Sequence, residues 1–234
     1  MTFDQHAGSY ENQVEASIAF ANVDHAFTTE RKAEHLIDLC TRLIGPPSEQ
    51  RVLDVGCGIG LTDALLAERV GRLHGIDVSP ESVQRAAATN PTAHYATFDG
   101  TAFPLPDESI DLAFAICVLH HVEPAERAGF VSELRRVVRP GGIVALFEHN
   151  PLNPLTRVAV SRCEFDEGVT LARRPTAARL LARSGLVVED GAYIIFTTSR
   201  RWSARADQML GWCPAGAQYY VAARRPPRST GEGP

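Results

Sequence analysis

The 234-residue chain is 44% hydrophobic and 22% charged, a balance that suits one α/β domain large enough to fold without disulfides or bound metal. Its formal net charge of −5 gives no domain-wide positive field and argues against nucleic acid as a partner. The five cysteines include no CxxC pair, which predicts reduced thiols and no metal site. The N-terminus lacks a basic and apolar leader, and no run of about 18 apolar residues occurs. These features predict a cytoplasmic protein without a membrane span.

The chain begins with a polar arm, residues 1–27, which precedes a helical pattern of apolar residues. This helix is predicted to be capped by Thr28 or Thr29 and to stop at Gly45. Strand and helix patterns then alternate. The strands are expected at 51–55, 72–78, 93–98, 111–118, 142–148, 186–197 and 217–223, and the helices at 61–70, 80–89, 126–138 and 176–185.

This alternation predicts one α/β domain over residues 1–224, with a mainly parallel sheet and helices on both faces. Residues 1–48 would form an N-terminal arm and helix, and 149–173 a substrate-side insertion that interrupts the alternation. Residues 225–234 are rich in proline, glycine and charge and are expected to be disordered. Open parallel sheets bind ligands at the carboxyl ends of their strands, and the motifs of this chain fall there.

The first motif is VLDVGCGIG, which joins the first strand to the first helix of the alternating part. Its glycines, Gly56, Gly58 and Gly60, allow a sharp turn and close approach of a ligand. The spacing differs from GxGxxG because Leu61 stands where that motif continues. Asp54, two residues before the first glycine, would repel a pyrophosphate but suits the ammonium and sulfonium of S-adenosylmethionine (SAM). A nicotinamide-dependent oxidoreductase is therefore disfavoured.

An acidic residue, Asp77, ends the next strand about twenty residues after the first glycine. Such a residue accepts hydrogen bonds from ribose hydroxyls in nucleotide-binding folds. A helix-capping aspartate is the alternative, but Ser79 already occupies the position before Pro80 where a cap is expected.

The third motif is FDGTAFPLP, followed by DESID, after the third strand. With VLHHV and LRRVVRPGG further along, it resembles the class I SAM-dependent methyltransferases of the small-molecule, methyltransferase-11-like type. The resemblance covers roughly 50–148 and the strand at 217–223. It implies a Rossmann-like seven-stranded sheet of order 3-2-1-4-5-7-6 with an antiparallel last strand, SAM as cofactor and S-adenosylhomocysteine as product.

The resemblance also implies site residues, since the family's first aspartate in this motif bonds the adenine amino group. That aspartate corresponds to Asp99. The predicted cofactor-binding residues are Asp54, Gly56, Cys57, Gly58, Gly60, Asp77, Val78, Asp99, Gly100, Thr101 and Cys117.

Methyl transfer requires a nucleophile held in line, and an oxygen nucleophile also needs a proton acceptor, for which histidine is the usual side chain. Two clusters follow apolar strands: His120-His121, and Glu148-His149-Asn150. We predict catalytic roles for His149, Glu148 and His121, and substrate-side positions for Tyr10, His25, His120 and Asn150. The alternatives are a structural histidine pair, a strand end that emerges into solvent, and a solvated arm.

These observations predict a SAM-dependent methyltransferase that acts on a small molecule, with an oxygen acceptor favoured. Methylation of a carbon on a quinone-like ring is the first alternative. A SAM-binding regulatory protein without transferase activity is the second, and a protein or nucleic-acid methyltransferase the third. The DPPY-type motif that clamps a flipped base is absent from the position after the fourth strand, which reads ICVLHHV. The oligomeric state is left open.

Overall fold

The structure is a computed structural model that describes residues 24–163 and 166–228. Its strands are β1 (Arg51–Val55), β2 (Arg72–Asp77), β3 (His94–Thr97), β4 (Ile110–Ile116), β5 (Val138–His149), β6 (Val187–Ile194) and β7 (Gln218–Arg224). Its helices are α2 (His25–Leu43), α3 (Asp63–Leu66), α4 (Pro80–Thr89), α5 (Arg127–Val137), α6 (Pro154–Arg162), α7 (Arg174–Arg183) and α8 (Ser203–Leu210), with a 3-10 turn, η3, at Pro47–Glu49.

The strands form one sheet in the order β3-β2-β1-β4-β5-β7-β6, which confirms the predicted order. The first five strands pair in parallel. The predicted antiparallel last strand is also confirmed, because β7 runs antiparallel to both β5 and β6. The carboxyl ends of β1, β2, β4 and β5 therefore meet at one edge of the sheet.

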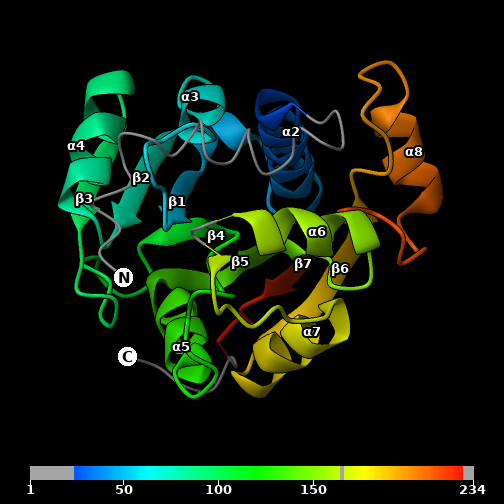
Figure 1. Ribbon diagram of the computed structural model, residues 1–234. Helices are drawn as coiled ribbons and strands as arrows, with labels where there is room; N and C mark the ends of the chain where they lie inside the picture. Colours follow the sequence, from blue (N-terminus) through cyan, green and yellow to red (C-terminus); the bar gives the residue numbers. More distant parts are fainter. Residues whose placement is uncertain (1–23, 164–165, 229–234) are drawn as a thin grey trace.

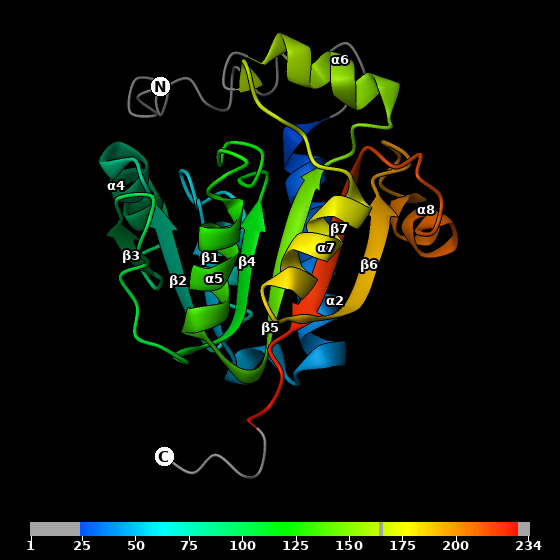
Figure 2. The same cartoon turned by 90° about the horizontal axis from the view of Figure 1, so that it is seen from below.

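Helices cover both faces of the sheet (Figure 1), with α2, α3 and α4 on one side and α5 and α7 on the other. Residues along β4 alternate between the two cores. Leu112 and Phe114 pack with α2, whereas Ala113 and Ala115 pack with α5 and α7. Burial of a side chain such as Phe114 contributes about 1.5–3 kcal/mol. Figure 2 shows α6 lying across the carboxyl ends of the strands, above the rest of the sheet.

Several element boundaries differ from the sequence-based prediction. Helix α2 begins earlier, inside the predicted arm, because Asp24 accepts a hydrogen bond from Ala26 N at 2.9 Å and caps the helix. The helix expected at 61–70 is reduced to the short α3, after which the backbone continues in turns. The predicted insertion contains α6, whose first turn is capped by Asn153, and α8 was not predicted.

Part of the predicted C-terminal tail is held against the domain. Arg225 donates hydrogen bonds to the carbonyl oxygens of Arg135, Arg136 and Val138, and it pairs with Glu108 at 2.8 Å. Within the described ranges, no helix is long and apolar enough to cross a membrane.

Candidate active site

The turn after β1 has a backbone conformation that requires glycine at two of its positions. Gly56 and Gly60 adopt φ angles of 77° and 79°, and a Cβ would lie 2.4 Å from Val118 Cγ2 at the first and 2.5 Å from Asn90 Nδ2 at the second. At Gly58 a Cβ would meet nothing within 4 Å. The turn is therefore packed on its two flanks and open at its centre, as a cradle for a ligand should be.

Asp77 ties the end of β2 to this turn. Its Oδ2 accepts a hydrogen bond from Gly58 N at 2.8 Å, and its Oδ1 accepts one from Ser79 N at 2.9 Å. Ser79 caps α4 through a bond from Ser82 N at 3.2 Å, as its position in the sequence predicts. The half-buried Asp77 carboxylate thus lies beside the open centre of the turn, and carboxylate oxygens can each accept a further hydrogen bond.

Asp99 stands on the neighbouring loop after β3 and is exposed. One oxygen, Oδ1, accepts bonds from Thr101 Oγ1 at 2.7 Å, Thr101 N at 2.8 Å and Ala102 N at 3.1 Å. These bonds, that from the Thr101 hydroxyl above all, lower the pKa of Asp99 to about 2. Val78 is 40% exposed, and its side chain lies next to Gly100. The loop therefore presents an apolar surface beside the ionised carboxylate of Asp99.

The environment of Asp54 differs from the one expected from the sequence, where its charge was predicted to face the cofactor. Its carboxyl is buried beneath the turn and hydrogen-bonded to that of Asp63. Burial, and then the charge of Asp63, raises the pKa of Asp54 well above its usual range, so the two carboxyls share a proton. The Asp54 side chain therefore does not present a free negative charge to a cofactor. Cys57 is buried as well, which leaves its backbone as the part that can face a ligand.

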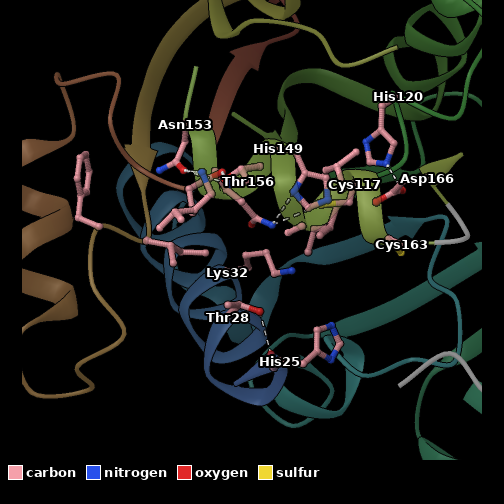
Figure 3. Close-up of a pocket in the computed structure, with 18 of the residues that line it drawn as sticks. His25, Thr28, Lys32, Cys117, His120, His149, Asn153, Thr156, Cys163 and Asp166 are labelled. Carbon is pink, nitrogen blue, oxygen red and sulfur yellow. Dashed lines mark hydrogen bonds and ion pairs between the residues drawn. The ribbon is translucent and has the colours of Figure 1, made fainter. Parts of the chain in front are cut away.

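A pocket of about 270 Å³ opens at the carboxyl ends of β4 and β5. It lies between the first turns of α2 and the overlying α6, and Figure 3 shows side chains from all of these elements pointing into it. Its polar lining includes His25, Lys32, Cys117, His121 and His149. The pocket thus adjoins the loop that follows β4, next to the glycine turn.

His120 lies at one end of this pocket, between two carboxylates. Its Nδ1 is 2.6 Å from Glu148 Oε2, and its Nε2 is 3.2 Å from Asp166 Oδ1. Burial alone would lower the pKa of His120, but the charges and hydrogen bonds of Glu148 and Asp166 outweigh it and raise that pKa well above the usual range. The raised pKa favours the imidazolium form of His120, which cannot accept a proton.

His121 and His149 have the opposite property. Burial, followed by the positive charge of His120, lowers the pKa of each ring to about 4. Both rings are therefore neutral at neutral pH, and both line the pocket. Gln218 Nε2 lies 3.5 Å from His149 Nδ1 and fixes the edge of that ring toward β7.

Two predicted site residues lie away from the pocket lining. Glu148 is buried, and its oxygens accept bonds from Leu119 N at 2.8 Å and from His120, so it positions a histidine and does not line the pocket. Asn150 is also buried, and its Nδ2 donates to the carbonyl oxygens of Pro214 at 3.0 Å and Gly216 at 2.8 Å. The expected substrate contact of Asn150 is therefore replaced by a structural role. Tyr10 lies outside the described residues.

Two charged residues of the pocket lining were missed in the sequence. Lys32 is buried and lines the pocket, and its position four residues before Leu36, on the apolar face of α2, was the available signal. Asp166 lies in the predicted insertion, after α6. The nearby sequence gives no sign of its role, because its histidine partner is 46 residues away in the chain.

Comparisons with known proteins agree with this geometry. A family model described as a methyltransferase domain matches residues 53–146. The 2-methyl-6-phytyl-1,4-hydroquinone methyltransferase of Synechocystis sp. is 40% identical over 108 residues, which cover 44% of this chain and 33% of that protein. The malonyl-[acyl-carrier protein] O-methyltransferase of Serratia marcescens is 33% identical over 110 residues, 46% of this chain and 42% of that protein.

A solved structure shares the fold at low sequence identity. It is the geranyl diphosphate C-methyltransferase of Streptomyces coelicolor A3(2) in complex with Mg²⁺, geranyl diphosphate and S-adenosylhomocysteine. It superposes with a TM-score of 0.63 at 18% identity, over 84% of this chain and 78% of that one. The chain spans between 33% and 61% of the length of the curated relatives that it matches first. The matching domain model identifies residues 53–146 as a methyltransferase domain, and the confirmed strand order gives the chain the fold of the class I SAM-dependent methyltransferases.

Proposed function

We propose that this chain transfers the methyl group of SAM to an oxygen atom of a small molecule held in the 270 Å³ pocket. The observation that carries the proposal is the placement of two neutral imidazoles, His121 and His149, in a pocket next to the cofactor turn. The name of the Serratia relative, an O-methyltransferase, supports oxygen as the acceptor atom. The pocket volume suits a small molecule.

The residues around the glycine turn fit the cofactor. Asp77 would accept bonds from the ribose hydroxyls, and the second oxygen of Asp99 would accept one from the adenine amino group. Gly58 leaves room for close approach, while Val78, Gly100, Thr101 and the loop at Cys117 would line the adenosine and the sulfonium. When bound, SAM supplies an electrophilic methyl group on a positively charged sulfur.

Lys32 occupies the junction between the two halves of the site. Its charge acts on Asp54 beneath the turn and on His149 in the pocket, and Figure 3 shows the side chain directed into the cavity. An ammonium in this position suits a carboxylate of the bound cofactor, because the pair would be shielded from water.

The acceptor side has to hold the nucleophile in line and remove its proton. A hydroxyl proton would pass to a ring nitrogen of His149 or His121, and the oxygen would form its bond to the methyl carbon as the carbon–sulfur bond breaks. The products are a methyl ether and S-adenosylhomocysteine. The raised pKa of His120 favours its protonated form, so His149 and His121 are the proposed bases. Correct positioning in a dry pocket can supply up to about 7–11 kcal/mol.

Calorimetry with SAM and S-adenosylhomocysteine tests the first half of the proposal, and absence of binding at millimolar SAM would remove it. For the second half, SAM with an isotopically labelled methyl group is incubated with phenols, hydroquinones and hydroxy acids. The chemical shift of the labelled carbon separates methyl on oxygen from methyl on carbon. Asp77→Ala serves as the variant deficient in cofactor binding. Methylation of ring carbon alone would contradict the oxygen assignment and leave the methyltransferase assignment in place.

A further inference from the structure

Three side chains at one end of the pocket bring their ligand atoms together. His120 Nε2 lies 3.2 Å and His121 Nε2 lies 3.5 Å from the same Asp166 oxygen. The ligand atoms of all three residues lie within 4.8 Å of one another. Figure 3 shows His120 and Asp166 facing each other at the edge of the cavity. Two imidazoles and one carboxylate are a common donor set for divalent transition metals.

The spacing fits an ion at the centre of the cluster. Metal–nitrogen and metal–oxygen bonds of about 2.1 Å place neighbouring ligand atoms about 3.0 Å apart in octahedral and about 3.4 Å apart in tetrahedral geometry. The separations from Asp166 to the two imidazoles, 3.2 and 3.5 Å, lie in or close to this range. The 4.8 Å limit for the whole set is wider than this range, so the ligand atoms would move closer together when an ion binds.

Glu148 provides an independent reason to expect a metal ligand. Its Oε2 lies 2.6 Å from His120 Nδ1, and its other oxygen is fixed by Leu119 N at 2.8 Å. A buried carboxylate that holds one ring nitrogen aims the other nitrogen of the same ring at Asp166. Metal-binding histidines usually have such an outer partner, which sets the tautomer and raises the basicity of the ligand.

We propose that His120, His121 and Asp166 bind a divalent first-row transition-metal ion of the Zn²⁺ type, with an open coordination position toward the pocket. Mg²⁺ and Ca²⁺ are not expected, because they prefer all-oxygen ligands. The two carboxylates, Glu148 and Asp166, balance the charge of a dication when the histidines are neutral. If the proposed methyl transfer is correct, the ion would bind an acceptor oxygen and lower the pKa of its hydroxyl, and His149, not the metal-bound His121, would accept the proton. This last step rests on the proposed function, whereas the metal site does not.

Metal binding is tested directly, without SAM or acceptor. The tag-free protein is stripped with chelator, titrated with Zn²⁺ in competition with a chromophoric chelator, and analysed for bound metal after gel filtration. We expect about one Zn²⁺ per chain. Asp166→Ala and His121→Ala should weaken binding by more than the roughly 10–100-fold that loss of an outer partner costs, and Glu148→Gln should weaken it by about that amount.

The control is His94→Gln, which removes an exposed histidine that stacks on His74 far along the sheet at β3. This variant should bind Zn²⁺ like the wild type, and Mg²⁺ should not compete. Thermal unfolding of each metal-free variant shows whether it is folded. A wild type that retains no Zn²⁺, an Asp166→Ala variant that is folded and binds as tightly as the wild type, or loss of binding in His94→Gln would each overturn the proposal. Methyltransferase activity enters none of these outcomes.

Discussion

The carboxyl pair beneath the glycine turn makes stability depend on pH in a direction that one substitution tests. Asp63 is buried, accepts a bond from Tyr95 Oη at 2.8 Å and shares a proton with Asp54. Burial, offset in part by the bonds from Tyr95 and Asp54, raises the pKa of Asp63 from 3.8 to about 6. A carboxyl whose pKa is raised on folding stabilises the fold fully when the pH is below its pKa in the unfolded chain. This contribution is lost as the pH rises through its pKa in the folded protein.

The size of the effect follows from the shift. About 2 pKa units correspond to about 3 kcal/mol, which ionisation of Asp63 costs the folded state at neutral pH. Asparagine at this position cannot ionise, yet its oxygen can accept from Tyr95 and its amide can donate to Asp54. The free energy of unfolding of Asp63→Asn, relative to the wild type, should therefore rise by about 2–3 kcal/mol between about pH 4 and about pH 7.5.

Denaturant unfolding at each pH measures this difference, with equal slopes as the check that both proteins unfold in the same way. Glu68→Gln, a comparable change at an exposed position nearby, is the control and should show no such trend. A wild-type-to-variant difference that stays flat across the range, or falls, would refute the raised pKa of Asp63.

Five further substitutions test other parts of the structure. Gly60→Ala should destabilise the fold by about 1–3 kcal/mol in denaturant unfolding because of its positive φ and the close Asn90 amide, whereas Gly58→Ala should be milder in unfolding and weaken SAM binding in calorimetry. Asp77→Ala should weaken SAM binding by about 10–100-fold, the value of one hydrogen bond to a charged group. His149→Gln should lower turnover with unchanged SAM affinity; equal losses in both would contradict its place in the acceptor pocket. Asp207→Asn, which breaks the buried ion pair between α8 and α2 at 3.0 Å, should cost about 3–5 kcal/mol of unfolding free energy.

The local geometry of the proposed cofactor half of the site was largely predictable because its signals are local. Each residue of the glycine turn is constrained by its own backbone angle or by an immediate packing partner, and Asp77 and Ser79 follow from the end of a strand and the start of a helix. Such constraints act within a few residues and leave a pattern in the sequence. The strand order followed from the family that these motifs resemble.

The acceptor half was less predictable because its chemistry depends on contacts that are distant in the sequence. Whether a histidine is charged or neutral here depends on which carboxylates reach it, and Asp166 reaches His120 from a loop beyond α6. The same limit explains Asp54, whose charge looked free in the sequence. Its partner Asp63 stands on the next helix, and only folding brings the two carboxyls together.

One short loop joins the two halves, and this constrains how the reaction could be tuned. At Cys117 the backbone after β4 takes a φ of 57°, a conformation that costs a non-glycine residue about 1–2 kcal/mol. Val118 then packs against Gly56 of the cofactor turn, and the following residues bond Glu148 and present His120. A residue larger than glycine at Gly56 would have to displace Val118. The same loop also carries the acceptor-side residues. A change at Gly56 should therefore disturb the binding of the methyl donor and the positions of the acceptor-side histidines together.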